Sequence, residues 1–238
     1  MIGRATARRA IARARVSRGA REVIDARLTY LSLAKIRNLE QCITDVKRRG
    51  IEGDLVEAGV ALGGSAILMA RQVEGGRRFH GYDVFEQIPA PSERDSEDAH
   101  RRYDVIAKGM STGIAGDPYY GYVSDLYRRV VQSFAARGLE VDGDRICLHK
   151  GLFESTLDLV EPVALAHIDC DWYNPVQLCL ERLGGLLSPG GYLVLDDYHD
   201  YGGCAQATHE YLVEHPELRV ARADSNLVIR RLDVSRAP

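Results

Sequence analysis

Two short apolar runs, each ending in aspartates, constrain the fold of this chain most strongly. Val163 to Ala166 leads into His167-Ile168-Asp169-Cys170-Asp171, and Tyr192 to Leu195 leads into Asp196-Asp197. A short apolar run of this kind is typical of a buried strand. If the two strands are adjacent and parallel, their carboxyl ends meet at one edge of a sheet, where open α/β sheets bind their ligands.

The clustered carboxylates of Asp169, Asp196 and Asp197 point to a metal site. Neighbouring carboxylates repel one another unless a cation lies between them, and hard divalent cations prefer oxygen ligands. Aspartates also follow strands as helix caps or turn residues, but capping does not require so many in one place. We therefore expect these three residues to bind Mg²⁺ or another divalent cation.

The rest of the chain alternates predicted strands and helices, which is typical of an α/β fold with helices on both faces of the sheet. Further strands are expected at 54–59, 79–83, 145–151, 218–221 and 227–230. Helices are expected at 29–49, 66–70, from the tyrosines at 119–127 to about 137, 175–187 and 204–215, with a tight turn at 188–191. The polar stretch 89–121 interrupts this alternation, and we expect it to be a lid over the site.

A glycine-rich turn after the first strand predicts a nucleotide-like ligand. Gly59, Gly63 and Gly64 precede a helix, and residues without a Cβ atom let a ligand approach the backbone closely. Asp83 ends the next strand, where Rossmann-like sheets place a carboxylate on ribose hydroxyls. The turn and Asp83 together indicate a ligand that contains adenosine, although tight packing and helix capping are alternative roles.

Composition restricts the class of protein. A chain of 238 residues with 45% hydrophobic and 27% charged residues is typical of a globular domain. We expect a cytoplasmic protein without a membrane partner, because no run approaches the roughly 18 apolar residues of a membrane span and none is a signal-peptide core. The net charge of −3 gives no general reason to expect nucleic acid. The scattered cysteines are expected to be reduced core thiols rather than disulfides or zinc ligands: Cys42, Cys147, Cys170, Cys179 and Cys204.

Residues 1–28 form a strongly basic arm, rich in arginine. Such an arm could bind an anionic partner, act as an organellar presequence, or form a helix that covers a dimer partner or the active site. The remainder, 29–238, is expected to be one domain. Because the arm and the helix at 29–49 look too exposed for a lone domain, we expect a homodimer or a larger homo-oligomer.

Six sequence blocks identify a family. They are Gly53-Asp54-Leu55-Val56-Glu57, Gly59-x3-Gly63-Gly64, Asp83-x-Phe85-x2-Ile88-Pro89, Lys150-Gly151-x-Phe153, His167-Ile168-Asp169-x-Asp171-Trp172-Tyr173 and Leu195-Asp196-Asp197-Tyr198, of which the last two are the most specific. From about residue 29 to 230 the chain resembles the macrocin O-methyltransferase family of class I, S-adenosylmethionine-dependent sugar methyltransferases. The resemblance implies a Rossmann-like, mostly parallel seven-stranded sheet whose seventh strand is antiparallel.

The resemblance also implies a site and a reaction. Asp169, Asp196 and Asp197 would hold Mg²⁺, and Asp171 would be the general base. The S-adenosylmethionine site would comprise Glu57, Gly59, Gly63, Ser65, Asp83, Gly151, Phe153 and Asp169. The acceptor would be a sugar hydroxyl of a small glycosylated natural product.

Two alternatives stay open. A metal-dependent methyltransferase of catechols or other phenols would use nearly the same ligands, although the long 89–121 segment favours a bulkier acceptor. A binding protein without catalytic activity could keep this fold and use its arginine arm on an acidic partner, but the intact carboxylate cluster argues against it.

Two blocks depart from the family, since Glu57-Ala58-Gly59-Val60-Ala61 replaces Glu-Thr-Gly-Val-Trp and Asp83-Val84-Phe85 replaces Asp-Ser-Phe.

Overall fold

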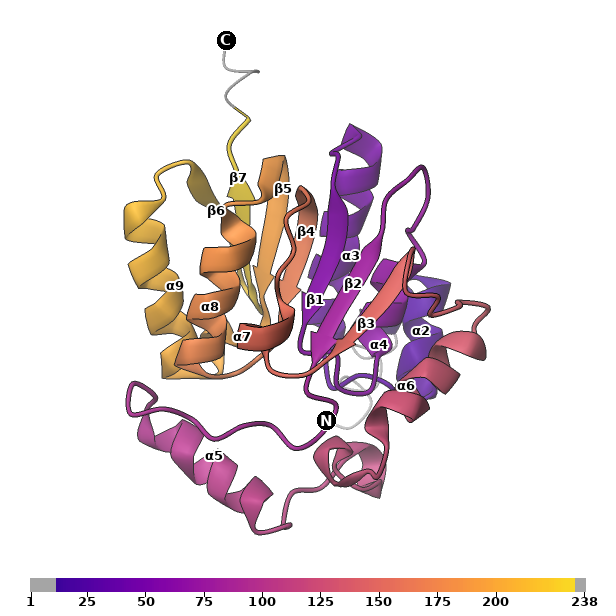
Figure 1. Ribbon diagram of the computed structural model, residues 1–238, viewed down its shortest axis with the longest axis vertical. Helices are drawn as coiled ribbons and strands as arrows, with labels where there is room; N and C mark the ends of the chain where they lie inside the picture. Colours follow the sequence, from indigo (N-terminus) through magenta and orange to yellow (C-terminus); the bar gives the residue numbers. More distant parts are fainter. Residues whose placement is uncertain (1–11, 234–238) are drawn as a thin grey trace.

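A seven-stranded sheet crosses the centre of the computed structural model, which describes residues 12–233 (Figure 1). Its order is β3-β2-β1-β4-β5-β7-β6. The strands are β1 Asp54–Ala58, β2 Phe79–Asp83, β3 Ile146–Lys150, β4 Val163–Ile168, β5 Leu187–Leu195, β6 Leu218–Ala223 and β7 Leu227–Arg231. β7 pairs antiparallel with β5 and β6, and the other pairs are parallel. The predicted sheet and its antiparallel seventh strand are thereby confirmed.

Helices cover both faces of the sheet, and each face has its own apolar core (Figure 1). Strand alternation separates the cores within β1, where Leu55 joins the first core and Val56 the second. The first core includes residues of α2 Arg18–Asp25, α3 Leu33–Arg49, α4 Gly64–Ala70 and α6 Leu126–Ala135. The second includes residues of α7 Phe153–Thr156, α8 Tyr173–Gly184 and α9 Gly202–Glu214.

The helix predicted at 29–49 begins at Leu33 because Ser32 caps it. The Ser32 hydroxyl accepts a hydrogen bond from the Lys35 backbone N–H at 3.3 Å. Gly50 ends the helix with φ 61°, a left-handed conformation that suits glycine. These two caps fix α3 behind the sheet in Figure 1 and set the position of Lys35 in its first turn.

The predicted lid at 89–121 lies below the carboxyl ends of the central strands in Figure 1. It contains α5 Glu97–Ala107 and η1 Ile114–Gly116, neither of which was predicted from the sequence, and it runs into η2 Tyr120–Tyr122. The helix predicted from the tyrosines at 119–127 begins as an α-helix only at Leu126, where α6 starts. α5 buries only Ala99 and Ile106, which explains its weak apolar periodicity. The Tyr122 hydroxyl donates to the Ile106 carbonyl at 2.6 Å, and the Trp172 indole N–H donates to the Pro89 carbonyl at 2.9 Å. The segment is thus tied both to itself and to the end of β4.

The tight turn predicted at 188–191 is wrong, because β5 already begins at Leu187. Leu187 pairs with Val163 and Tyr192 pairs with Leu165, so the turn-forming residues occupy an irregularity within the strand. Gly190 has φ 81° there. Glycine and proline between two apolar runs gave a turn signal that the β4–β5 ladder overrides.

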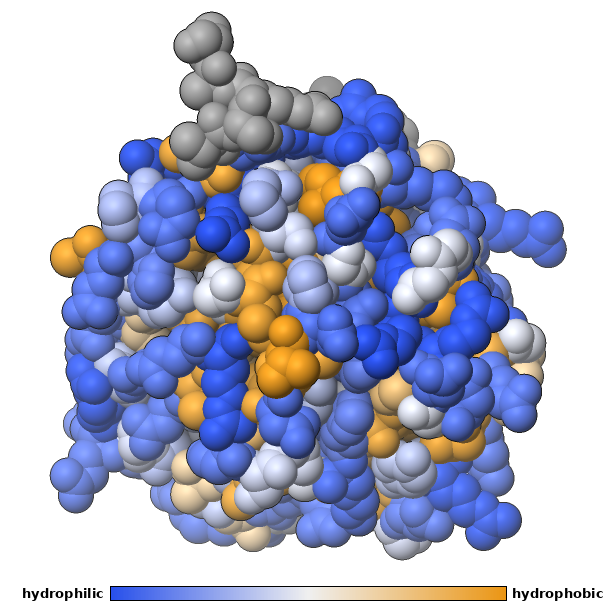
Figure 2. All heavy atoms as spheres, turned by 45° about the horizontal axis from the view of Figure 1, so that its top comes forward, coloured by the Kyte–Doolittle hydropathy of each residue, from blue (hydrophilic) through white to orange (hydrophobic). Residues whose placement is uncertain are grey.

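Part of the predicted basic arm packs on the domain. α2 buries Ala20 and Val23, and Glu22 forms ion pairs with Arg71 at 2.7 Å and Arg137 at 3.0 Å. Residues 1–11 of the arm lie outside the described residues. Figure 2 shows one face that is mostly hydrophilic and carries small apolar patches, as the surfaces of globular proteins do. Within residues 12–233, no helix is both long and apolar enough to cross a membrane.

Candidate active site

The three aspartates predicted to bind metal lie together where β4 and β5 end. Ile168 pairs with Leu195 in the parallel ladder, so the residues that follow both strands emerge at the same edge. Ligand oxygen atoms of Asp169, Asp196 and Asp197 lie within 4.8 Å of one another. The topology has brought together carboxylates that are far apart in the sequence.

A buried row of alternating charges runs from the first strand to α3 through this cluster. The His167 Nδ1 atom lies 2.7 Å from Glu57 Oε1, and its Nε2 atom lies 3.7 Å from Asp196 Oδ1. The Lys35 ammonium donates to Asp196 Oδ2 at 2.7 Å and to Asp200 at 2.7 Å. Glu57 and His167 are completely buried. Each charge in the row therefore has a neighbour of opposite sign, as buried charges require.

The row sets the protonation of its members. Burial opposes the charged form of His167, but Asp196 and Glu57 raise its pKa well above the ordinary value, which favours an imidazolium that donates to Glu57 and lies beside the Asp196 carboxylate. Burial also acts to raise the pKa of Asp196, yet His167 and Lys35 outweigh it and hold that pKa below its ordinary range. Asp196 is thus the carboxylate of the cluster that stays ionised most readily.

Asp169 and Asp197 differ from Asp196 because no cation among residues 12–233 neutralises them as Lys35 and His167 neutralise Asp196. Burial, followed by the charges of Asp196 and Asp197, raises the pKa of Asp169 well above its ordinary value. Burial and Asp196 raise the pKa of Asp197 to about 6. A cation bound between these two carboxyls would therefore stabilise their ionised forms.

Asp171 adjoins the cluster from the loop beyond β4. β4 ends at Ile168, and Asp171 adopts a left-handed conformation with φ 58°. Its backbone N–H donates to Asp197 Oδ2 at 3.0 Å. Burial, with Asp197 and Asp196, raises the pKa of the Asp171 carboxyl well above its ordinary value. A carboxylate with a raised pKa is a stronger base.

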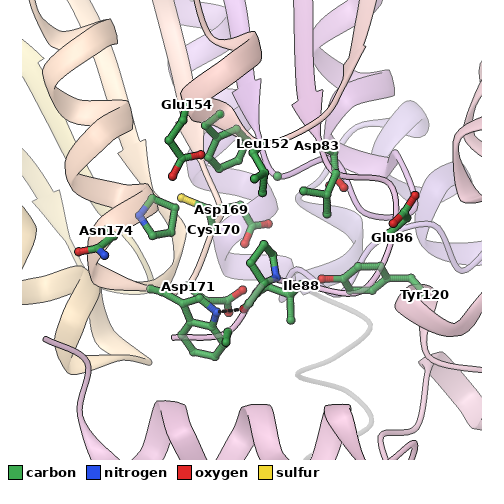
Figure 3. Close-up of a pocket in the computed structure, with 17 residues that line it drawn as sticks. Asp83, Glu86, Ile88, Tyr120, Leu152, Glu154, Asp169, Cys170, Asp171 and Asn174 are labelled. Carbon is green, nitrogen blue, oxygen red and sulfur yellow. Dashed lines mark hydrogen bonds between the residues drawn. The ribbon is translucent and has the colours of Figure 1, made fainter. Parts of the chain in front are cut away.

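Two adjoining cavities meet at these carboxylates. The first is open to solvent and has a volume of about 180 Å³, and Figure 3 shows Asp83, Asp169 and Asp171 around it. The second has a volume of about 240 Å³ and adds Asp196 and Asp197. The cavities share part of their lining: Gly59, Asp83, Ile88, Tyr120, Asp169, Asp171 and Trp172. A ligand in one would therefore lie beside a ligand in the other.

The two cavities have different walls. Around the first lie residues that follow β2 and β3, together with the start of α8: Val84, Glu86, Leu152, Phe153, Glu154, Asn174 and Pro175. The second is lined instead by Lys35 of α3, by Arg102 and Tyr119 of the 89–121 segment, and by two tyrosines that precede α3 and α9, Tyr30 and Tyr201. The second cavity therefore offers ring faces and hydrogen-bond donors beside the carboxylates.

The glycine turn brings the backbone close to the cluster. Gly59 has φ 95°, and a Cβ atom there would lie 1.8 Å from the Asp169 carbonyl oxygen, so only glycine fits. The buried Asp83 carboxylate accepts hydrogen bonds from the backbone N–H groups of Val60 and Ala61 at 2.8 and 2.9 Å. Asp83 thereby holds the turn as well as lining both cavities.

The predicted donor-site residues fall into two groups. Gly59, Asp83, Phe153 and Asp169 line the first cavity. In the part of the chain described here, the other four line neither cavity: Glu57, Gly63, Ser65 and Gly151. Glu57 instead contacts His167, and Gly63 faces Val130 and Phe134.

Lys35, Arg102 and Tyr201 line the second cavity, but they were not predicted as site residues from the sequence. Lys35 is a polar residue in an amphipathic helix and Arg102 lies in a polar segment, so neither stands out by spacing. His167 belonged to the most specific sequence block, but it was not given a role. Only the packing of α3, the lid and β4 reveals that these residues surround the carboxylates.

Comparison with known proteins identifies the family. Residues 5–220 match the family model described as macrocin-O-methyltransferase (TylF). The chain is 31% identical over 189 residues to the 8-demethyl-8-(2,3-dimethoxy-alpha-L-rhamnosyl)-tetracenomycin-C 4'-O-methyltransferase of Streptomyces olivaceus, a match that covers 77% of this chain and 67% of the relative. It is 28% identical over 198 residues to the mycinamicin III 3''-O-methyltransferase of Micromonospora griseorubida, covering 79% and 71%.

The fold has solved counterparts. The structure of the O-methyltransferase NovP superposes with a TM-score of 0.70 at 26% identity, covering 86% of this chain and 82% of that one. Sequence and structure comparisons therefore agree on both the fold and the reaction class. The chain belongs to the macrocin O-methyltransferase family and is an S-adenosylmethionine-dependent O-methyltransferase.

Proposed function

We propose that this enzyme transfers a methyl group from S-adenosylmethionine to a sugar hydroxyl of a glycosylated natural product, with the help of Mg²⁺. One observation carries the proposal: the cluster of Asp169, Asp196 and Asp197 lies where the two cavities meet. The relatives support the acceptor class, because one is named for a rhamnosyl tetracenomycin and another for mycinamicin III.

The first cavity is the proposed donor site. S-adenosylmethionine combines an adenosine with an amino acid, and the cavity extends from Phe153 past Asp83 to Gly59 and Asp169. In Rossmann-like sheets the carboxylate after the second strand accepts hydrogen bonds from the ribose, which is the role proposed for Asp83. Gly59 lets the donor approach the backbone at the end of β1. The other predicted donor residues, Glu57, Gly63, Ser65 and Gly151, would act by shaping this wall.

The three clustered aspartates fit Mg²⁺ by their chemistry. Asp196 Oδ1 is buried and has no hydrogen-bond partner among residues 12–233, so this oxygen is free to coordinate a cation. Together with Asp169 and Asp197 it forms an all-oxygen ligand set, which hard divalent cations prefer. A bound Mg²⁺ supplies Lewis-acid chemistry, lowering the pKa of a hydroxyl that it coordinates.

The chain's own residues would orient the acceptor and remove its proton. Asp171 lines both cavities, so its carboxylate can accept the hydroxyl proton beside the donor. Its raised pKa makes it a better base than an exposed aspartate. Trp172, Tyr119 and Tyr201 provide ring faces for a sugar and exclude water from the reacting atoms.

Calorimetry and a panel of acceptors test the proposal together. S-adenosylmethionine should bind without Mg²⁺, and Asp83→Ala should weaken that binding severely. Turnover should require Mg²⁺, fall to background with excess chelator, and favour glycosylated acceptors over their aglycones and over catechols. A protein that fails to bind the donor, or one that is fully active in chelator, would contradict the proposal; a preference for catechols would establish the phenolic alternative.

We further propose that the domain of residues 29–238 works in the cytoplasm as a homodimer or larger homo-oligomer, with the arm at 1–28 against a partner or the lid. Support comes from arginines of the arm that stay exposed although α2 packs on its own domain, Arg15 and Arg18. Light scattering of the full chain, and of a chain that begins at residue 12, tests this arrangement. A monomer with unchanged activity after the truncation would contradict it.

A further inference from the structure

A second group of metal-ligating side chains lies on the sheet, away from the carboxylate cluster. In the β2–β3 ladder His80 pairs with Cys147 and Tyr82 pairs with His149. Because side chains two residues apart on a strand share a face, His80, Cys147 and His149 lie on the face that carries Tyr82. β3 is the edge strand of the sheet, and Figure 1 shows α8 and α9 at the other end of that face.

The ligand atoms of this group are as close as one metal ion requires. The His80 Nδ1 and His149 Nε2 atoms are 3.1 Å apart, and a nitrogen of each ring and the Cys147 sulfur lie within 4.8 Å of one another. Two imidazole nitrogens at about 2.0–2.1 Å from a tetrahedral Zn²⁺ are roughly 3.3–3.4 Å apart. The two nitrogens are thus nearly as far apart as a shared Zn²⁺ would hold them.

The Asp54 carboxylate lies beside the His80 Nε2 atom, which faces away from His149. Asp54 Oδ2 lies 3.4 Å from His80 Nε2, and Asp54 Oδ1 accepts the Arg78 backbone N–H at 2.8 Å. A histidine that binds a metal through one nitrogen usually donates its other N–H to a carboxylate, which fixes the tautomer and the ring orientation. Asp54 would hold the Nδ1 atom of His80 free for a metal.

Burial and ring stacking restrict the motion of the three side chains. His80 and Cys147 are only 6% and 7% exposed, whereas His149 is partly exposed and leaves a route for an ion. The His149 ring stacks on Tyr82 with centroids 4.3 Å apart and an interplanar angle of 11°. The three ligands are thus preorganised rather than mobile surface groups.

We propose that His80, Cys147 and His149 bind a divalent transition metal of the Zn²⁺ type, separate from the proposed Mg²⁺ site. Imidazole and thiolate ligands select such metals over Mg²⁺, and three protein ligands leave a fourth position for water. The ion joins edge strand β3 to β2, both of which lead to the first cavity. Its effect is to stabilise this edge of the sheet, since a ligand that binds only the folded state raises its stability.

The alternative is that His80 and His149 simply share a hydrogen bond. Cys147 was expected from the sequence to be a core thiol, because no cysteine or histidine spacing of a zinc motif is present. Such spacing is not required here, since strand pairing brings the ligands together from two distant segments. The two readings differ in whether Cys147 becomes a thiolate ligand, and this can be measured.

Cobalt spectroscopy of the full chain tests the site without any activity assay. After removal of metals with a chelator, Co²⁺ is added to the wild type and to Cys147→Ser, His149→Gln and two controls, Cys42→Ser and Asp197→Asn. The wild type and both controls should show a thiolate-to-cobalt absorption band, and Cys147→Ser should lose it. Loss of an outer partner of a ligand costs about 10- to 100-fold in metal affinity, so His149→Gln should weaken Zn²⁺ binding about 100-fold or more.

The outcomes separate the two readings. The site is supported if, in addition, Zn²⁺ raises the melting temperature of the wild type and of Asp197→Asn but not that of Cys147→Ser. Thermal unfolding in chelator shows whether each variant is folded before metal is added. The proposal is overturned if the wild type has no thiolate-to-cobalt band, or if Cys147→Ser and His149→Gln bind Zn²⁺ as tightly as the wild type does.

Discussion

Replacement of His167 by glutamine should destabilise the protein far more than the loss of one hydrogen bond. His167 is completely buried between Glu57, 2.7 Å from Nδ1, and Asp196, 3.7 Å from Nε2. Glutamine can still donate to one carboxylate, but it carries no charge. His167→Gln therefore leaves the buried Glu57 without a cation, and this kind of loss costs about 3–5 kcal/mol.

The expected shift in melting temperature follows from the size of the protein. For a chain of 150–250 residues, 1 kcal/mol corresponds to about 2–4 °C, so His167→Gln should melt about 6–20 °C below the wild type. The deficit should grow as the pH rises. Burial already raises the pKa of Glu57, His167 only partly opposes this, and without the imidazolium the folded state binds the Glu57 proton more strongly still. Stability from that proton is present at low pH and lost as Glu57 ionises.

Two controls isolate the buried charge. His215→Gln removes a histidine from a partly exposed pair, 3.0 Å from Glu217, and should cost less than about 1 kcal/mol. Glu57→Gln combined with His167→Gln removes both charges, and should recover about 0.5–3 kcal/mol relative to the sum of the single effects. Urea unfolding in chelator at pH 5 and pH 8 measures five proteins: the wild type, the single variants His167→Gln, Glu57→Gln and His215→Gln, and the double variant. A loss as small as that of His215→Gln, or strict additivity in the double variant, would refute the reasoning.

Three further predictions concern the site. Asp171→Asn should lower turnover by about 10²- to 10⁴-fold with nearly unchanged donor and metal affinity, whereas extra Mg²⁺ should restore part of the turnover of Asp197→Asn. If saturating Mg²⁺ rescues the turnover of Asp171→Asn, the role of Asp171 is metal coordination, and the exposed His199 is the next candidate base. Burial and Asp196 raise the pKa of Asp197 from 3.8 to about 6, so its contribution to the stability of the metal-free protein is present below about pH 4 and lost as the pH rises through 6. Mg²⁺ affinity should rise over the same interval, because the ligand must be deprotonated, and a flat calorimetric profile from pH 4 to 8 would contradict this. Gly59→Ala should abolish donor binding, because its Cβ would lie 1.8 Å from the Asp169 carbonyl oxygen, whereas Gly50→Ala, at φ 61° with nothing within 4 Å, should cost only the left-handed backbone strain of about 1–2 kcal/mol.

The parts of the fold that the sequence predicted are those governed by local rules. β4 and the end of β5 read as apolar runs because both faces of their sheet are covered, and α3 showed the period of a helix with one buried face. α5 was missed because only Ala99 and Ile106 are buried along it. The register irregularity before Tyr192 was missed because pairing with β4, rather than local sequence, decides where β5 begins.

In the candidate site, the positions of the aspartates follow from local rules, but their protonation states depend on tertiary packing. Adjacent parallel strands must end at one edge, so the sequence alone predicts that Asp169, Asp196 and Asp197 lie together. The protonation states of these aspartates could not be predicted from the sequence. Lys35 comes from α3, and its approach to Asp196 at 2.7 Å depends on how that helix packs. The two cations beside Asp196 keep it ionised, while Asp197 has a pKa of about 6. Identical side chains in one cluster therefore differ as ligands, and the difference comes from residues outside the motif that revealed the cluster.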